Sequence, residues 1–377
     1  MKSFIELGLK NEINCALEKQ NIKVPTQIQC LSIPKILEGE KVIAESHTGS
    51  GKTLAFLAPL FQLLDTSKKE TQVVVLAPTH ELVIQIENVA KHLNKNSEIP
   101  VTSLPIIGDV NIEKQIKKIK EVKPHIIVAT PGRLLDLIQK KKIKMHTVKH
   151  IVVDEADNLL DNTNSPVVKA IIKTTLRDTK VHVFSATITD KLLSTCKDIV
   201  GDGSLIKGES KVAINPNIEH MYLEVDPRDK VETLRKLISA TETEKALVFL
   251  NKAYDIDLVT EKLNFHNIKA LSIHKKATKE QRQNAIESFR NGKVKVLVSS
   301  DISARGLDIE GIDHVINLDF PTNANEYLHR AGRTARGENK GCTISLVTPK
   351  EKAAIRIYER EFKIKLEKKV LLNGKLL

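Results

Sequence analysis

The segment that most constrains this chain is Ser46–Thr53, which reads Ser-His-Thr-Gly-Ser-Gly-Lys-Thr. It follows the apolar run Val42–Ala44 and precedes helically spaced apolar residues at 54–57, so it joins a predicted strand to a predicted helix. Glycine allows the backbone amides of such a loop to approach phosphate oxygens at the positive end of the helix. The alternative is a glycine-rich turn that only connects the two elements. The complete motif in this context favours a nucleoside triphosphate site.

The residue types in this loop have distinct expected roles. We expect the Lys52 ammonium group to reach the β- and γ-phosphates and the Thr53 hydroxyl to hold Mg²⁺. The other loop residues expected to bind the nucleotide are Ser46, His47, Thr48, Gly49, Ser50 and Gly51.

The composition argues against several classes of protein. At 377 residues, the chain is long enough for two domains of ordinary size. It has no apolar run of the roughly 18 residues needed to span a membrane, and its N-terminus lacks a signal-peptide core. The cysteines, whose spacing fits neither a disulfide framework nor a zinc site, are Cys15, Cys30, Cys196 and Cys342. We expect a cytoplasmic protein that does not bind membranes.

The charge of the chain favours a polyanionic partner. The net charge is +12 and the isoelectric point is near 9.3. Lysines cluster at 114–120 and 140–144, although such clusters are equally typical of solvated faces. Aromatic residues make up only 3% of the chain and tryptophan is absent, so base stacking is not the expected mode of binding. The backbone of a nucleic acid is the better target.

The chain alternates short runs rich in Val and Ile with helical patterns. This order is typical of an α/β fold, in which helices cover both faces of a parallel sheet. After the run at 42–44, the further strands predicted in the first half are Gln72–Ala77, Val101–Ile107, His125–Ala129, His150–Val153 and Val181–Phe184. A helix is predicted over Glu81–Leu93. Ligands of such a sheet bind at the carboxyl ends of the strands.

A second series of strands and helices follows an irregular stretch. Its predicted strands are Lys245–Leu250, Ile268–Ile273, Val294–Ser299, His314–Asn317 and Cys342–Val347. A helix over Lys350–Phe362 closes the chain. We therefore predict two similar α/β domains in tandem, at 1–208 and 218–377, joined by a linker at 209–217.

Acidic residues follow the predicted strand at 150–153, in the order Asp154-Glu155-Ala156-Asp157. Carboxylates at the end of a buried strand suit ATP hydrolysis. We expect Asp154 to hold Mg²⁺ through water and Glu155 to polarise the attacking water as general base. The alternative is an acidic helix N-terminus without a catalytic role. The phosphate loop upstream favours the catalytic interpretation.

The second half has no phosphate loop of its own but carries His329–Arg336, which contains three arginines. The alternative interpretation is an ordinary basic helix face. In a separate domain, such arginines complete an ATP site only when the two halves close, and they then stabilise charge on the transferring phosphoryl group. The segment Asp301–Asp308 follows a predicted strand and provides further polar groups.

From about residue 4 to about 347, this set of motifs resembles that of DEAD-box RNA helicases of superfamily 2. Pro25–Gln29 is similar to the family's adenine-reading motif, and Phe4 to its isolated upstream aromatic residue. Ser185–Thr187 is similar to the segment that links ATP hydrolysis to duplex separation. The resemblance implies two RecA-like domains, with Gln29 bound to the adenine edge and Phe4 beside the ring.

The resemblance implies further roles at the nucleotide. Asp308 would contact the ribose, and Arg333 and Arg336 would be the arginine fingers. His329 would join the network between the two domains.

The resemblance also implies an RNA-binding surface. Its residues would be Pro78, Thr79, Gly108, Thr130, Gly132 and Arg133 in the first half, and Arg282 and Ser300 in the second. Hydroxyls, an arginine and helix N-termini suit phosphates rather than base edges, so binding should not depend on the RNA sequence. Contacts with 2′-hydroxyl groups would favour RNA over DNA.

Four positions depart clearly from the family pattern. His80 stands where arginine is usual, which weakens one RNA contact at neutral pH. Asp109 replaces the second glycine of a usual pair and places a carboxylate near the expected RNA path. Lys275 and Lys279 replace a usual glycine and glutamine and add compensating positive charge. Milder departures are Asn21, Ile22, Ser46, Ser300 and Ala335.

These departures spare the residues expected to hydrolyse ATP, so we expect them to affect RNA affinity rather than catalysis. The sequence predicts an ATP-dependent RNA helicase with ATP and Mg²⁺ as cofactors, which acts as a monomer on short RNA duplexes or RNA–protein complexes. Two alternatives stay open at this point. One is an ATP-gated RNA clamp or chaperone whose hydrolysis only controls release. The other is a DNA helicase, which the adenine-reading and Asp-Glu-Ala-Asp motifs argue against.

Overall fold

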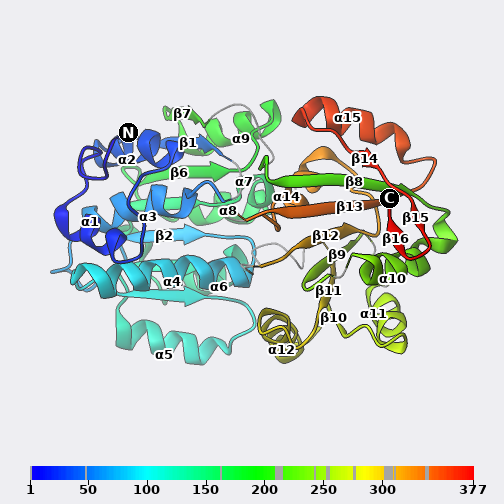
Figure 1. The fold of residues 1–377 in the computed structure, drawn as a ribbon. Helices are drawn as coiled ribbons and strands as arrows, with labels where there is room; N and C mark the ends of the chain where they lie inside the picture. Colours follow the sequence, from blue (N-terminus) through cyan, green and yellow to red (C-terminus); the bar gives the residue numbers. More distant parts are fainter. Residues whose placement is uncertain are drawn as a thin grey trace. The chain divides into compact units, whose positions relative to one another are not determined.

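The computed structural model describes the chain except residues 1, 47–48, 162–163, 209–214, 242, 252–254, 275–276, 301–308, 310 and 336–338. The chain divides into two compact units (Figure 1), an N-terminal unit at 1–210 and a C-terminal unit at 211–377. The division falls at the start of the segment 209–217 that the sequence predicts as a linker.

The N-terminal unit is built on a seven-stranded parallel sheet with the order β3-β4-β2-β5-β6-β1-β7. Its strands are β1 (Val42–Glu45), β2 (Val73–Leu76), β3 (Ser103–Ile106), β4 (Ile126–Ala129), β5 (His150–Val153), β6 (Lys180–Ser185) and β7 (Ser204–Lys207). Its helices are α1 (Asn11–Glu18), α2 (Gln27–Leu37), α3 (Lys52–Leu63), α4 (His80–Ser97), α5 (Ile112–Val122), α6 (Pro131–Gln139), α7 (Ala156–Leu159), α8 (Ser165–Ile172) and α9 (Asp190–Val200), with a 3-10 turn at Met145–Thr147.

Alternating residues of the central strands supply two hydrophobic cores, one on each face of this sheet. Val73 and Val75 of β2 lie in one core, which α2, α3 and α4 cover. Val74 and Leu76 lie in the other core, which α6, α8 and α9 cover. Because both faces are covered, the central strands are almost entirely apolar.

The C-terminal unit has a second seven-stranded parallel sheet, with the order β10-β11-β9-β12-β13-β8-β14. Its strands are β8 (Ile218–Glu224), β9 (Ala246–Leu250), β10 (Ala270–Ile273), β11 (Val296–Ser300), β12 (His314–Asn317), β13 (Gly341–Val347) and β14 (Glu367–Lys368). Counted along the chain, the strands of both units lie in the order 3-4-2-5-6-1-7. The predicted pair of similar α/β folds in tandem is therefore confirmed.

Helices cover the second sheet in the same manner. They are α10 (Lys230–Ala240), α11 (Asp255–Phe265), α12 (Lys279–Arg290), α14 (Ala324–Ala331) and α15 (Lys352–Phe362), with a 3-10 turn at Pro227–Asp229. Val248 of β9 lies in the core on one face and Leu247 in the core on the other. A further cluster joins α14 to α15 through Tyr327, Tyr358 and Phe362. A short hairpin, β15 (Leu371–Leu372) and β16 (Lys375–Leu376), follows β14.

The structure contains strands that the sequence patterns did not predict. β7 lies in the stretch at 201–217 that the sequence predicts as irregular, and the sequence predicts no strand at β8 or at the C-terminal strands. β7 has one buried residue among four, and β8 contains the polar residues Glu219, His220 and Glu224. Neither shows the continuous apolar run that marks the central strands, because both lie towards the edge of a sheet.

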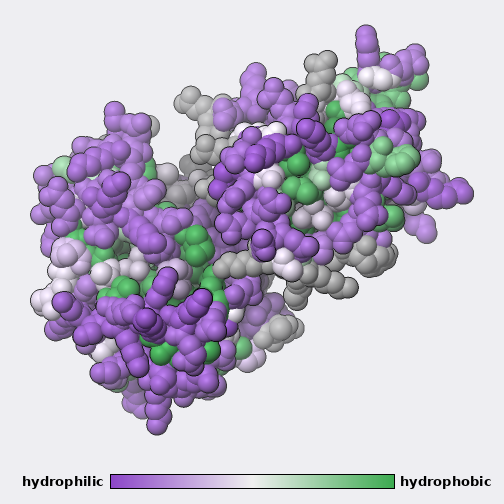
Figure 2. Space-filling model, turned by 90° about the horizontal axis from the view of Figure 1, so that it is seen from below, coloured by the Kyte–Doolittle hydropathy of each residue, from purple (hydrophilic) through white to green (hydrophobic). Residues whose placement is uncertain are grey.

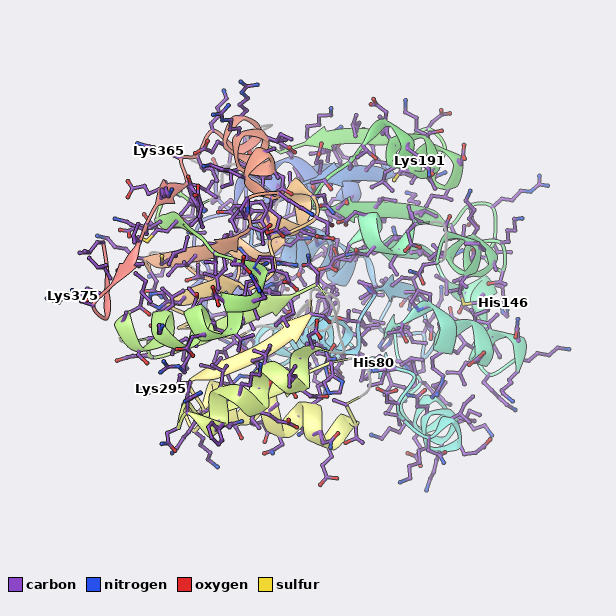
Figure 3. All side chains as sticks on the ribbon, turned by 90° about the vertical axis from the view of Figure 1, so that its right-hand side faces the viewer. His80, His146, Lys191, Lys295, Lys365 and Lys375 are labelled. Atoms are coloured by element: carbon purple, nitrogen blue, oxygen red, sulfur yellow. The ribbon has the colours of Figure 1, made fainter. Side chains whose placement is uncertain are left out.

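The face of the molecule seen in Figure 2 is mainly hydrophilic. In the view of Figure 2, hydrophobic residues form only small scattered patches. The lysines labelled in Figure 3, Lys191, Lys295, Lys365 and Lys375, are all exposed to solvent. Across the ranges that the structure describes, no helix is long and apolar enough to cross a membrane.

Candidate active site

The phosphate loop leaves the carboxyl end of β1 and ends where α3 begins at Lys52. Gly49 and Gly51 have φ angles of +83° and +89°, in the left-handed region that favours glycine. A Cβ atom at Gly51 would also lie 2.5 Å from Nε2 of Gln29, so no larger residue fits there without displacing that side chain. The loop therefore has the backbone conformation that its glycines predict.

Lys52 lies at the first position of α3, and its Nζ donates a hydrogen bond to the carbonyl oxygen of Ser46 at 2.5 Å. Loss of hydration lowers the pKa of Lys52, while attraction to Asp154, Glu155 and Asp157 raises it. The lysine of the phosphate loop and the acidic segment thus share one electrostatic environment. His47 and Thr48 were also predicted to bind nucleotide, but they lie outside the described residues.

The acidic segment begins directly after β5. Asp154 is only 3% exposed, and burial raises the pKa of its carboxyl group to about 7, against the opposing attraction of Lys52. The backbone N–H of Glu155 donates to Asp154 Oδ1 at 2.9 Å, and Asn158 Nδ2 donates to Glu155 Oε2 at 3.1 Å. Glu155 has a φ angle of +49°. A residue other than glycine in this conformation is strained, and such strain clusters at functional sites.

A serine at the end of β6 connects this segment to the next part of the site. The backbone N–H of Asp157 donates to Ser185 Oγ at 3.2 Å. The same hydroxyl lies 3.0 Å from Asp157 Oδ1 and 2.7 Å from the carbonyl oxygen of Thr187. Ser185 thus joins the acidic segment to the Ser185–Thr187 motif. The sequence suggested a role for the motif but not this contact.

The residues predicted to hold Mg²⁺ are few. Thr53 is the second residue of α3, and Asp154 supplies a buried carboxylate. Within the described part of the chain, no group of three or more His, Cys, Asp and Glu side chains could hold a metal ion. A small protein ligand set fits Mg²⁺, which usually keeps several waters and binds one or two carboxylates plus substrate phosphates.

The adenine-reading motif contacts the phosphate loop. Gln29 is buried in α2, where its Oε1 accepts from the backbone N–H of Thr26 at 2.9 Å. Its Nε2 donates to the carbonyl oxygen of Gly51 at 3.0 Å. Phe4 is buried in the hydrophobic core on this side of the sheet. The expected contacts of Gln29 and Phe4 with adenine stay predictions.

The residues predicted to bind RNA in the N-terminal unit follow three neighbouring strands, β3, β4 and β2. Pro78 and Thr79 follow β2, and the Thr79 hydroxyl caps α4 by accepting from Leu82 N–H at 3.3 Å. Thr130 and the exposed Gly132 lie at the start of α6, after β4. Because all these strands are parallel, their carboxyl ends meet at one edge of the sheet.

Arg133 and Gly108 lie at the same edge, but the Arg133 side chain makes hydrogen bonds within the protein. Its Nη1 donates to the carbonyl oxygen of Val110 at 2.6 Å and to Gln115 Oε1 at 3.2 Å, and its Nη2 donates to the carbonyl oxygen of Gly108. The guanidinium group thus holds the loop 108–110 after β3. The family resemblance implies only an RNA contact for Arg133, and that contact stays a prediction.

The C-terminal unit places its predicted residues on α12, β11 and α14. Arg282 is half-buried on α12, and Ser300 is the last residue of β11. His329 is half-buried on α14, and Arg333 follows that helix with its side chain buried. The predicted finger Arg336 and the predicted ribose contact Asp308 lie outside the described residues.

Arg330 is a structural residue that the sequence did not identify. Its side chain is 1% exposed and its guanidinium carbon lies 5.1 Å from the centre of the Phe249 ring. Nη1 donates to Asn317 Oδ1 at 3.2 Å and to the Asp319 carbonyl oxygen at 2.7 Å, and Nη2 donates to Asn251 Oδ1 at 2.6 Å. These bonds fix α14, which carries His329 and is followed by Arg333, to the carboxyl ends of β9 and β12.

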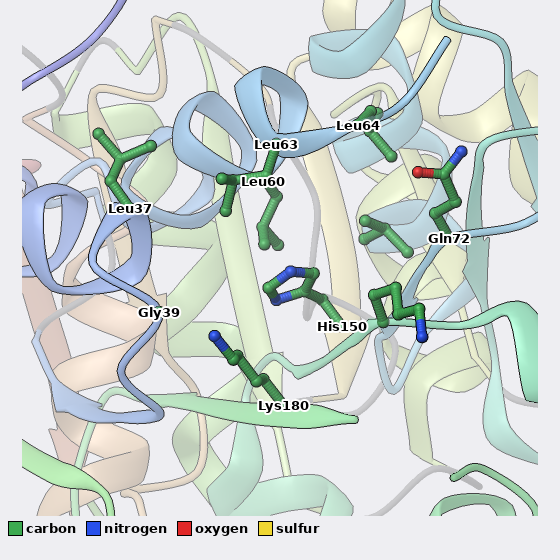
Figure 4. Close-up of a pocket in the computed structure, with 10 residues that line it drawn as sticks. Leu37, Gly39, Leu60, Leu63, Leu64, Gln72, His150 and Lys180 are labelled. Atoms are coloured by element: carbon green, nitrogen blue, oxygen red, sulfur yellow. The ribbon is translucent and has the colours of Figure 1, made fainter. Parts of the chain in front are cut away.

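A hollow of about 190 Å³ lies elsewhere in the N-terminal unit (Figure 4). It is found at the amino ends of β2, β5 and β6, the opposite edge of the sheet from the phosphate loop. At its wall, Nδ1 of His150 lies 3.1 Å from Nε2 of His182, and burial lowers the pKa of these side chains to about 4 and about 3. No predicted site residue lines this hollow.

Two family models match the chain, one in each unit. The DEAD/DEAH box helicase model matches residues 26–195, and the helicase conserved C-terminal domain model matches residues 229–338. The matches cover the phosphate loop and acidic segment in the first unit and the arginine segment in the second.

Similar proteins extend the likeness to nearly the whole chain. The chain is 40% identical to the DEAD-box ATP-dependent RNA helicase CshC of Bacillus cereus, over 95% of this chain and 91% of that protein. It is also 40% identical to the probable ATP-dependent RNA helicase YfmL of Bacillus subtilis, over 93% of this chain and 92% of that protein.

The fold is similar to that of S. cerevisiae Dbp5 bound to RNA and ADP BeF3, with a TM-score of 0.89 and 29% sequence identity over 98% of this chain and 95% of that chain. This likeness confirms the predicted tandem of RecA-like domains. Motifs, fold and relatives agree, and the chain belongs to the family of DEAD-box ATP-dependent RNA helicases.

Proposed function

We propose that the protein hydrolyses ATP to unwind short RNA duplexes or to remodel RNA–protein complexes. The observation that carries this proposal is the electrostatic coupling of Lys52, at the phosphate loop, to Asp154 and Glu155 after β5. A phosphate-binding lysine and two carboxylates in one place are the groups that hydrolysis of a nucleoside triphosphate requires.

Each of these groups has a separate role in the proposal. The Lys52 ammonium group binds the β- and γ-phosphates, together with the backbone amides of residues 46–51. Thr53 and Asp154 hold Mg²⁺, which neutralises charge on the phosphate oxygens when it is bound. Glu155 orients and polarises the attacking water, and its side-chain bond to Asn158 limits the positions of the carboxylate.

The C-terminal unit completes the site in this proposal. Arg333 and Arg336 stabilise the charge that develops on the transferring phosphoryl group, and His329 joins the network between the two units. ATP and RNA together favour a closed state of the two units, and hydrolysis returns the protein to the open state. The buried bonds of Arg330 support this role for His329 and Arg333, because they hold α14, the helix that carries His329 and precedes Arg333.

The RNA partner is bound through its backbone. The supporting observation is that Thr79, Thr130 and Gly132 follow neighbouring strands at their carboxyl ends, and all three lie at helix starts. Helix N-termini and hydroxyls bind phosphates without reading base edges. The relative Dbp5 was solved bound to RNA and ADP BeF3, which supports the same partner class here.

We further propose that the protein acts as a monomer in the cytoplasm. All four cysteines are free, which supports a compartment that keeps thiols reduced.

The test is a steady-state ATPase assay with and without single-stranded RNA. We expect RNA to stimulate turnover, and Glu155→Gln to bind ATP but to lose about 10²–10³-fold in rate. Turnover that RNA does not change would contradict the proposal. Duplex separation with a non-hydrolysable ATP analogue in place of ATP then distinguishes a turnover helicase, which needs hydrolysis for repeated cycles, from an ATP-gated clamp.

A further inference from the structure

His80 and Asp109, two positions that depart from the family pattern, contact each other. Nδ1 of His80, the first residue of α4, lies 2.8 Å from Oδ2 of Asp109, in the loop after β3. The two residues are 29 positions apart in the sequence, and each lies just beyond the carboxyl end of a strand. His80 is labelled in Figure 3.

The second nitrogen of the His80 ring determines how the pair works. The backbone N–H of Gly108 donates to His80 Nε2 at 3.3 Å, so Nε2 acts as an acceptor. Nδ1 then carries the proton and donates it to the Asp109 carboxylate. One imidazole ring thus holds both the backbone of Gly108 and the carboxylate beside it.

Arg133 also holds this loop, through separate hydrogen bonds. Its guanidinium group donates to the carbonyl oxygens of Gly108 and Val110. Gln115 supports the arrangement, since its Oε1 accepts from Arg133 and its Nε2 donates to the Ile107 carbonyl oxygen at 2.8 Å. The loop 108–110 is therefore fixed, and the position of the Asp109 carboxylate with it.

The carboxylate is presented to solvent at the edge proposed to bind RNA. The Asp109 side chain is 58% exposed and the His80 side chain 31% exposed. Thr79 precedes His80, and Thr130 and Gly132 follow the neighbouring strand β4. A negative charge is thus fixed among groups that are suited to bind phosphate.

We propose that Asp109 is an internal competitor of RNA phosphate and that His80 is the positioning residue that holds it in place. The carboxylate occupies the Nδ1–H donor that a phosphate oxygen would otherwise accept from, and it repels a phosphate that approaches the loop. The His80–Asp109 pair thus lowers the affinity of this edge of the sheet for RNA. The inference rests on the proposed function, because it assumes that RNA binds at this edge.

The first test is the affinity of the full chain for a fluorescently labelled single-stranded RNA, measured by anisotropy with a non-hydrolysable ATP analogue present. Asp109→Asn should tighten binding about two- to fivefold, which is the usual effect of one exposed charge. The RNA concentration that gives half-maximal ATPase stimulation should fall by the same factor, while the maximal rate stays unchanged. A purely structural role would not move these two quantities in this way.

The matched control is Asp178→Asn. Asp178 is 64% exposed and pairs with Lys149 at 3.3 Å, as Asp109 pairs with His80, but it lies before β6 at the opposite edge of the sheet. Asp178→Asn removes the same charge from the same unit as Asp109→Asn does. Any general effect of net charge on RNA binding therefore appears in both variants. We expect Asp178→Asn to leave RNA affinity unchanged.

A second comparison tests the positioning role of His80. In a His80→Ala background the carboxylate is no longer held, so Asp109→Asn should tighten binding less than it does in the parent chain. The double variant His80→Arg with Asp109→Gly replaces the pair by a free cation. The plot of log affinity against log salt concentration should then steepen by about 0.7, the value for one added phosphate contact on a single strand.

The outcomes separate this inference from the proposed function. If the parent chain binds RNA and Asp109→Asn matches Asp178→Asn, Asp109 does not compete with phosphate and the inference is wrong. Weaker RNA binding by Asp109→Asn also overturns it, since the carboxylate would then support the site. An equal effect of Asp109→Asn in the parent chain and in the His80→Ala background would show that His80 does not position the carboxylate. A parent chain that binds no RNA refutes the proposed function itself. Thermal unfolding of each variant verifies that it is folded.

Discussion

At the scale of single residues, the proposed nucleotide site contains two side chains, Lys52 and Asp154, whose burial disfavours their charged forms. Burial raises the pKa of Asp154 to about 7 and lowers that of Lys52, while the attraction between the two groups limits both shifts. Perturbed groups of opposite sign that share one environment are typical of a functional site. The sequence predicts the identity of these residues, but only the fold determines how deeply each is buried.

The raised pKa of Asp154 has a consequence for ligand binding. Near pH 7 the carboxyl group is partly protonated, and a bound Mg²⁺ favours the ionised form. Binding of Mg²⁺ with nucleotide should therefore release a proton, and affinity should fall as the pH drops through about 7. Calorimetric titrations at pH 7 in buffers of different ionisation enthalpy measure this release.

Binding of Mg²⁺ with nucleotide to Asp154→Asn should lack that proton release. The matched control is Asp198→Asn, which removes an exposed carboxylate. The same released proton in the parent chain and in Asp154→Asn would show that another group titrates.

The direction of this pKa shift also determines how the stability of the protein depends on pH. Because folding raises this pKa, the carboxyl group ionises in the unfolded chain at a lower pH than in the folded protein. The free energy of unfolding of the free protein should therefore fall as the pH rises from about 4 to about 7.

A second prediction at this scale concerns Ala335, which stands in the left-handed region with a φ angle of +52°. An alanine there is strained by about 1–2 kcal/mol relative to glycine, partly offset by the greater freedom of glycine in the unfolded chain. Ala335→Gly should therefore leave the free energy of unfolding unchanged or raise it by up to about 1 kcal/mol. Ala353→Gly, at an exposed helical position of α15, should instead lower it by up to about 1 kcal/mol. Denaturant unfolding measures both, and equal losses would contradict the strain at Ala335.

At the scale of secondary-structure elements, the sequence predicts the central strands well and the outer ones poorly. β5 and β12 have the predicted bounds because their apolar runs are buried on both faces. β7 and β8 carry polar residues within the strand, so only their pairing in the sheet defines them as strands, β7 with β1 and β8 with β13 and β14. Side-chain contacts such as that of Gln29 with Gly51 were likewise not predictable, because they join elements that are distant in the sequence.

Arg330 shows how one buried side chain positions an element. It binds Asn251, Asn317 and the Asp319 carbonyl from α14, so its loss leaves several buried polar groups without a donor. Arg330→Met should lower the free energy of unfolding of the C-terminal unit by about 3–5 kcal/mol. Arg356→Met, on the exposed side of α15, is the control and should change it by less than about 0.5 kcal/mol. Similar unfolding midpoints for the two variants would show that Arg330 does not anchor α14.

At the scale of the whole molecule, the two units repeat one fold but carry different sequence motifs. Both sheets have the same strand order, yet only the first unit has a phosphate loop after its first strand. In the second unit, Val225–Pro227 follows the equivalent strand β8 and contains no glycine. The second unit instead supplies the arginine segment. A nucleotide site built from both would make hydrolysis depend on their closure.

This dependence gives the last prediction. Residues 1–208 contain the phosphate loop, Asp154 and Glu155, but they lack the arginines proposed to stabilise the transferring phosphoryl group. Arginine fingers contribute roughly 10³–10⁵-fold to turnover in related phosphoryl-transfer reactions. The isolated 1–208 fragment should therefore show almost no RNA-stimulated ATPase activity.

Arg333→Ala in the full chain should resemble the fragment in turnover and still bind nucleotide, because the groups proposed to hold the phosphates lie in the other unit. Arg333 is buried, so its removal could also disturb the fold, and Arg333→Lys keeps the charge and most of the volume while removing the planar guanidinium group. If phosphoryl-charge stabilisation is the role, turnover should fall in both variants while thermal unfolding of Arg333→Lys stays near that of the parent. RNA-stimulated turnover by the 1–208 fragment near the rate of the full chain would refute a mechanism that depends on closure, and with it the proposed role of the C-terminal unit.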